Sequence, residues 1–99
     1  MPVDRRPLSP DEISSLVAAL DSWEHDGASL RRQLVFDSFV QAFGFMAQVA
    51  LIAERLDHHP NWSNVYNRVD IAISTHDAGG LTALDFEFVR RVDAILPRD

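Results

Sequence analysis

Three of the four histidines lie within one short segment, with His58 and His59 adjacent and His76 at the end of a β-patterned run. The imidazole group has an unperturbed pKa of ~6.5, so it can donate or accept a proton near neutral pH. Three imidazoles could instead bind a metal ion such as zinc. The sequence therefore predicts a site in this segment that uses either proton transfer or metal binding.

Carboxylates accompany these histidines. Glu54 precedes His58 by four residues at the end of a helical pattern, and positions four apart share one face of a helix that persists that far. Either Glu54 or Asp77 could complete a zinc shell with the three histidines. The sequence has neither a His-Glu-x-x-His motif nor a histidine pair four apart. A third interpretation is that the histidine pair is a solvated helix end, where it would interact favourably with the helix dipole.

The segment resembles the signature of the pterin-4a-carbinolamine dehydratase family. In that family a Glu precedes Asp-His-His-Pro, then a Trp and Asn-Val-Tyr follow, and Ser-Thr-His comes after the next strand. The matching residues here are Glu54, 57–60, Trp62, 64–66 and 74–76. The resemblance extends over the chain from about Trp23 onward. One mild departure is Asp77, which stands where a Glu is common in the family.

The resemblance implies a dehydratase that removes water from a 4a-hydroxytetrahydropterin to give the quinonoid dihydropterin, during recycling of a tetrahydrobiopterin-type cofactor. Elimination needs an acid for the departing hydroxyl and a base for the N5 proton, and histidine can serve as both near its pKa. We expect His58 and His76 to flank C4a and N5, and His59 to assist. The resemblance implies no metal, no redox cofactor and no covalent nucleophile.

The substrate's 2-amino and N3–H groups form a donor pair that suits a carboxylate or backbone carbonyls. Candidate partners are Glu54 and Asp57, together with Ser74, Thr75 and Asp77, which the resemblance suggests. Pro60 and Trp62 follow the histidine pair and complete the expected binding residues, although Trp62 could equally be part of the core. We expect Tyr66 in the core or an interface, and Asp85 as a helix cap without a catalytic role.

The chain is expected to form a single domain over residues 1–99. Apolar periodicity predicts helices over 10–20, 38–57 and 83–96 and strands over 23–25, 28–36 and 65–73, the last as one interrupted strand or two short ones. Short connections between strands favour an antiparallel sheet of about four strands with helices packed on one face. The resulting α+β fold has the order α-β-β-α-β-β-α, as the resemblance also implies.

Composition restricts the partners and the compartment. The net charge is −6, which disfavours direct binding of nucleic acid. The absence of cysteine fits a reducing, cytoplasmic compartment. The N-terminal segment lacks an apolar signal core. The apolar run from Phe43 to Ala53 is too short to span a bilayer, so we expect no membrane association.

Small size favours self-association. A chain of 99 residues buries only about two-thirds of its unfolded surface, and the predicted central helix has a broad apolar stripe. We expect a homodimer or homotetramer. An alternative role also comes from the resemblance: some members are dimerisation cofactors for a homeodomain transcription factor, and others are assembly factors with a degraded histidine set. The intact histidine set here favours the enzyme.

Overall fold

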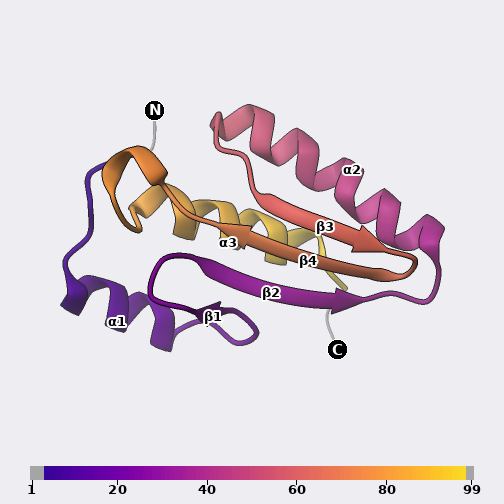
Figure 1. Cartoon of the computed structure of the whole chain (residues 1–99), viewed down its shortest axis with the longest axis horizontal. Helices are drawn as coiled ribbons and strands as arrows, with labels where there is room; N and C mark the ends of the chain where they lie inside the picture. The colour runs from indigo at the N-terminus through magenta and orange to yellow at the C-terminus, as the bar shows by residue number, and fades with distance from the viewer. Residues whose placement is uncertain (1–3, 98–99) are drawn as a thin grey trace.

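The computed structural model describes residues 4–97. The elements in chain order are α1 (Pro10–Ala18), β1 (Glu24–His25), β2 (Leu30–Val35), α2 (Phe39–Leu56), β3 (Asn61–Val65), β4 (Arg68–Ile73), a 3₁₀ turn (His76–Ala78) and α3 (Ala83–Ile95). Figure 1 shows their arrangement. The predicted α+β fold and its order are confirmed. The interrupted strand predicted over 65–73 is two strands, and the first of them, β3, begins at Asn61, four residues before the predicted range.

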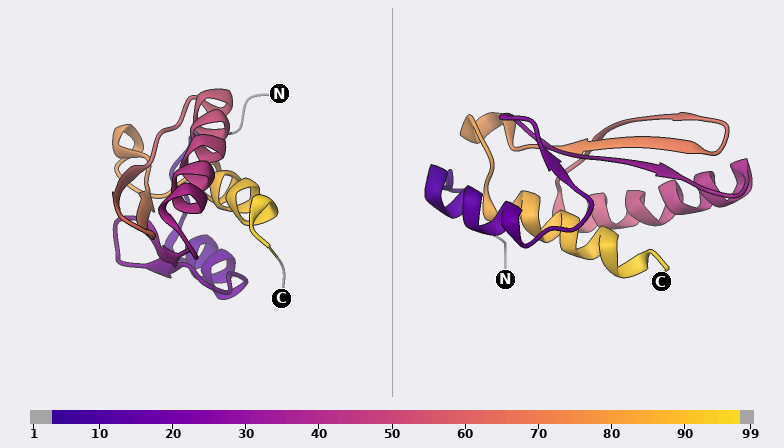
Figure 2. Two further views of the ribbon diagram at one scale, coloured as in Figure 1. Left: turned by 90° about the vertical axis from the view of Figure 1, so that its right-hand side faces the viewer. Right: turned by 90° about the horizontal axis from the view of Figure 1, so that it is seen from below.

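The four strands form one antiparallel sheet in the order β1-β2-β4-β3. Along β4 the side chains of Val69, Ile71 and Ile73 are buried, whereas those of Asp70 and Ala72 alternate with them and are only partly covered. Figure 2 shows the helices gathered on one side of the sheet. The sheet therefore has a helix-covered face and an open face, as its period-two pattern requires.

The core lies between the sheet and helices α2 and α3. Both helices bury an apolar stripe against the strands, because residues three and four apart return to the same helix face. Phe45 and Val49 are the buried centre of α2, and Phe88 and Val92 are that of α3. Tyr66 does not belong to this core: it occupies the β3–β4 turn with a φ of 52° and is 65% exposed.

The helix boundaries follow from their caps. Ser9 and Glu12 form the predicted capping box of α1, which ends at Ala18, two residues before the predicted end. Ser38 caps α2 by accepting a hydrogen bond from the backbone of Gln41 at 3.1 Å. The helix ends at Leu56, because the following residue adopts a left-handed conformation.

Helix α2 is longer than the apolar run on which the expectation of no membrane span rested. Within residues 4–97 it is the one helix long and apolar enough to cross a bilayer, with 18 residues and a mean hydropathy of 1.3. One of its faces, which includes Ala42, Phe45 and Val49, packs into the domain core. A core helix of a globular domain has this pattern, so α2 does not indicate a membrane protein.

Candidate active site

The chain reverses sharply between α2 and β3, and this turn separates the adjacent histidines. Asp57 has a φ of 50° and a ψ of 49°, and the His58 backbone N–H donates to the carbonyl of Ala53 at 3.0 Å. The expected shared face of Glu54 and His58 does not form, because the helix ends before His58. Glu54 instead lies 2.5 Å from the Nε2 atom of His59.

His58 is buried behind the turn. Its Nε2 atom lies 2.5 Å from Oδ1 of Asp85, whose side chain has no solvent exposure. The other oxygen of Asp85 accepts hydrogen bonds from the Thr82 backbone at 2.9 Å and from the Thr75 hydroxyl at 2.8 Å. The contact with Asp85 fixes the orientation of the His58 ring, because both oxygens of this carboxyl group are held by partners in the core.

Asp85 has two functions in this network. It forms the predicted capping box with Thr82 at the start of α3, which confirms its expected role as a cap. Its contact with His58 was not predicted. The two residues are 27 positions apart, and only the packing of α3 against the end of α2 brings them together.

His59 and His76 are exposed and line one cavity of about 310 Å³. His59 reaches it from the turn before β3, and His76 reaches it from the 3₁₀ turn after β4. The volume lies at the lower end of the range for small-molecule sites. The other lining residues are Ala28, Ser29, Arg31, Asn61, Trp62, Ser63, Asp70, Ala72 and Ser74.

The predicted site residues thus divide into two groups. The cavity brings together His59, Trp62, Ser74 and His76, while Glu54 is connected to it through His59. The remaining predicted residues do not line it: His58, Asp57, Pro60, Thr75 and Asp77. The sequence led us to expect the first histidine of the pair in one pocket with His76. In the structure the side chain of His58 turns into the core and does not line this cavity.

Thr75 and Asp57 have structural contacts of their own. The Thr75 hydroxyl is buried and bonds to Asp85 and to the Thr82 hydroxyl, the latter at 3.0 Å. The carbonyl of Asp57 accepts a hydrogen bond from Arg5 at 3.0 Å. Trp62 is half-buried and packs against the core while lining the cavity.

Sequence reasoning missed the strand residues of the cavity. Arg31 on β2 is the cross-strand neighbour of Ala72, which in turn lies opposite Asn61 on β3. Asp70 lies opposite Ser63 in the next row. Alternation with the buried Leu30 and Leu34 could have placed Arg31 on the open face, but the pairing of strands distant in sequence leaves no such local signal.

The zinc alternative needs at least three ligating side chains close together. Within residues 4–97, no three His, Asp or Glu side chains come together closely enough to hold a metal ion. Two histidines line the cavity, and the third is hydrogen-bonded to Asp85 in the core. The side chains of the cavity itself offer hydrogen-bond donors and acceptors that surround two exposed imidazoles.

Comparison with known proteins places this geometry in a family. Residues 6–95 match the family model described as pterin 4 alpha carbinolamine dehydratase. The chain belongs to this family. A relative from Mesorhizobium japonicum, named "Putative pterin-4-alpha-carbinolamine dehydratase", is 50% identical over 90% of this chain and 93% of its own length. A relative of the same name from Prochlorococcus marinus is 43% identical over 94% of this chain and 97% of its own length.

Two solved structures resemble this chain. A crystal structure of a transcriptional coactivator/pterin dehydratase from Brucella melitensis has a TM-score of 0.86 and 46% identity, and it covers 93% of this chain and 100% of that one. A pterin dehydratase-like protein identified as a RuBisCO assembly factor in the alpha-carboxysome has a TM-score of 0.63 and 27% identity, covering 75% of this chain and 88% of that one.

Proposed function

We propose that this chain is a dehydratase that removes water from a 4a-hydroxytetrahydropterin to give the quinonoid dihydropterin. The observation that carries the proposal is the pair of exposed histidines, His59 and His76, which come from different turns to line one cavity. Membership of the pterin 4 alpha carbinolamine dehydratase family supports the choice of substrate. The reaction needs no cofactor, because elimination of water neither oxidises nor reduces the pterin.

The two cavity histidines supply the proton transfers. One imidazolium protonates the hydroxyl that leaves C4a, and the other, neutral imidazole accepts the proton from N5. Glu54 holds the orientation of the His59 ring by its contact at 2.5 Å. Trp62 supplies an apolar wall for the bicyclic ring, and the Ser74 hydroxyl supplies a hydrogen-bonding group.

His58 has a positioning role in this scheme. Its ring is held by Asp85 in the core, so it fixes the turn from which His59 extends. This assignment exchanges the roles expected from the sequence, in which His58 was the reacting residue and His59 the assistant. Thr75 supports the same network through its bond to Asp85.

The test is an assay of carbinolamine dehydration with a synthetic or enzymatically generated 4a-hydroxytetrahydropterin, measured above the uncatalysed loss of water. We expect a rate proportional to protein concentration. Exhaustive chelation should leave both the rate and the folding of the protein unchanged, because the scheme uses no Lewis acid. Loss of activity on chelation, restored by zinc, would contradict it.

We further propose that the chain forms a homodimer or homotetramer through the exposed side of α2. Val40, Phe43, Ala47 and Leu51 follow one another at spacings of three and four residues and are exposed. They form an apolar stripe, and the small Gly44 beside it lets a second helix approach closely. Light scattering should show an oligomer for the native chain and a monomer for Leu51→Glu; a native monomer at micromolar concentration would contradict the proposal.

The alternative is a non-catalytic role in which the same apolar stripe of α2 binds another protein instead of a second copy of this chain. The words "transcriptional coactivator" and "RuBisCO assembly factor" in the two structure descriptions belong to relatives, and they make this the second candidate. The exposed apolar stripe of α2 supports it equally well. Absence of dehydration by a correctly folded protein would favour this role over the enzyme.

A further inference from the structure

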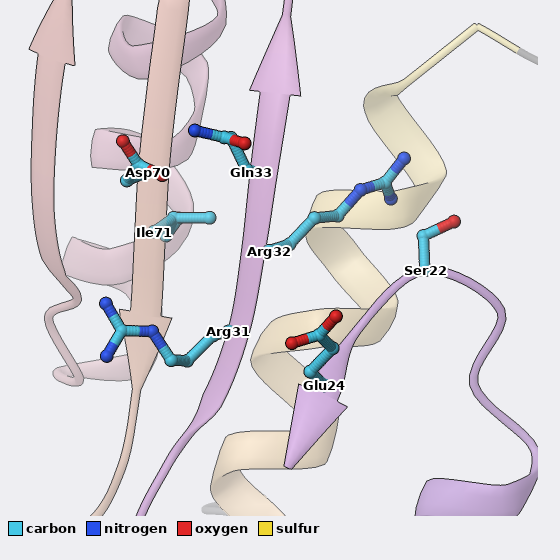
Figure 3. Close-up of a pocket in the computed structure, with 7 residues that line it drawn as sticks. All are labelled: Ser22, Glu24, Arg31, Arg32, Gln33, Asp70 and Ile71. Atoms are coloured by element: carbon cyan, nitrogen blue, oxygen red, sulfur yellow. The ribbon is translucent and has the colours of Figure 1, made fainter. Parts of the chain in front are cut away.

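The cavity that contains His59 and His76 continues along the open face of the sheet. A second hollow of about 380 Å³ lies beside it, lined by Ser22, Glu24, Arg31, Arg32, Gln33, Asp70 and Ile71. Arg31 and Asp70 line both. Figure 3 shows the Arg31 side chain extending from β2 across β4, with Asp70 further along the same strand. The two hollows are therefore neighbouring parts of one trough.

Strand pairing explains the shape of this trough. Ala72 lies between Arg31 and Asn61 in one cross-strand row, and its small side chain leaves room above the sheet. The next row contains Gln33, Asp70 and Ser63. Strands rise about 3.3 Å per residue, so the Arg31 row lies about 7 Å from Ser74, and the Asp70 row lies about 13 Å from it.

The two charged groups that line both hollows, Arg31 and Asp70, retain hydrogen-bonding capacity. Nη1 of Arg31 lies 3.5 Å from a carboxylate oxygen of Asp26. Asp26 already accepts bonds from the backbone N–H groups of Ala28 and Ser29, at 3.0 and 2.7 Å, and these hold its pKa well below its usual range. Within residues 4–97 the other side-chain donors of Arg31 make no hydrogen bond, so a ligand could accept from them. Over the described residues, the closest charged partner of the Asp70 carboxylate is Nε of Arg68, at 4.0 Å.

The chemistry of the trough favours a neutral polar ligand. Arg31 and Asp70 line both of its halves, and Glu24 and Arg32 add one charge of each sign to the second hollow. These four charges balance, so they favour neither an anion nor a cation. The amides of Asn61 and Gln33 and the hydroxyl of Ser63 add donors and acceptors. Alternating donors and acceptors over a shallow floor suit a chain of hydroxyl groups, each of which both donates and accepts.

We infer that Arg31 and Asp70 form a subsite for an extended, uncharged, hydroxylated substituent at C6 of the pterin. The inference rests on the proposed function, which places the ring beside His59 and His76. A short hydroxylated substituent then reaches the Arg31 row, and a longer one reaches Asp70. These two residues select among pterins by their side chain, while the histidines act on the ring that all pterins share.

The test measures equilibrium binding of three 7,8-dihydropterins by fluorescence, with methyl, trihydroxypropyl or trihydroxypropyl phosphate at C6. The native protein should bind the trihydroxypropyl compound about tenfold more tightly than the methyl compound, the effect of one charge-assisted hydrogen bond. The phosphate ester should bind no more tightly than the neutral alcohol. Arg31→Met and Asp70→Asn should each reduce the preference for the alcohol to nearly one.

Arg90→Met is the matched control. Arg90 is an exposed arginine on α3 and lines neither hollow, so this variant should keep the tenfold preference. Equal binding of the methyl and trihydroxypropyl compounds, or tighter binding of the phosphate ester, would overturn the inference. So would a preference that persists in Arg31→Met.

A parallel assay separates this inference from the proposed function. If the protein dehydrates the 6-methyl substrate but binds all three pterins equally, the subsite is refuted and the dehydratase function is supported. A side-chain preference that depends on Arg31, in a protein that dehydrates neither substrate, would support the subsite and overturn the dehydratase.

Discussion

His58 and His59 are covalent neighbours with opposite environments. His58 is 7% exposed and hydrogen-bonded to a fully buried carboxylate. The side chain of His59 is 55% exposed and contacts a carboxylate that is itself 76% exposed. The left-handed conformation of Asp57 ends α2 and turns the two rings apart. Two adjacent histidines can therefore take different roles, because the backbone conformation before them directs one ring into the core and the other toward solvent.

The two environments predict that substitutions at the buried pair affect stability and that substitutions at the exposed pair affect catalysis. Removing one partner of a buried hydrogen-bonded pair destabilises the fold strongly, because the other partner remains buried without compensation. An exposed pair contributes little to folding, but its proton can exchange with a substrate in the cavity. Variants of the buried network should therefore alter unfolding, whereas variants of the cavity should alter turnover.

The largest expected effect is on turnover. His76→Ala and His59→Ala should each lower the rate of carbinolamine dehydration by ~10²–10⁴-fold, because each removes one acid–base group. Their thermal unfolding should match that of the native chain. His25→Ala is the control, since His25 is an exposed histidine on β1 outside this cavity. Near-native turnover by both cavity variants would refute the catalytic assignment.

The next effect is on stability. Asp85→Ala removes the charge opposite His58, the bond from Thr75 and the capping box of α3. We expect a loss of about 3–5 kcal/mol in the free energy of unfolding, as for other broken buried pairs, and a midpoint lowered by more than ten degrees. Urea unfolding and calorimetry measure both. A loss below about 1 kcal/mol would show that the network does not stabilise the fold.

Substitution of Glu54, the exposed carboxylate that contacts His59, should have a smaller effect on turnover. Glu54→Gln keeps the size of the side chain but removes the charge that holds His59. We expect turnover to fall about tenfold, since a positioning contact is worth about 1–1.5 kcal/mol. The dehydration assay with the 4a-hydroxytetrahydropterin measures this loss, and an unchanged rate would show that the contact has no part in the reaction.

The sequence predicted the elements of this protein better than the environments of its side chains. Capping residues such as Ser9, Ser38 and Thr82 lie next to the helices they begin, so local chemistry identified the boundaries. The contact of Asp85 with His58 and the row that joins Arg31 to Ala72 depend on tertiary packing. No local pattern encodes them. The family resemblance identified the histidines together, but it did not indicate which of the adjacent pair is buried.

The smallest expected effect is on stability and comes from Glu87, a partly exposed carboxylate on the same helix as the buried Asp85. Glu87 lies two residues after Asp85 on α3, and hydrogen bonds from Arg90 and Arg91 lower the pKa of its carboxyl from 4.5 to about 2. Its stabilising contribution is therefore complete above pH 4.5 and is lost as the pH falls toward 2. Because the Arg90 side chain is 68% exposed, the contribution should be below about 1 kcal/mol. Urea unfolding of Glu87→Gln should show this small loss at pH 7 and a smaller one at pH 3. A loss as large as that of Asp85→Ala would mean that burial does not distinguish the two carboxylates.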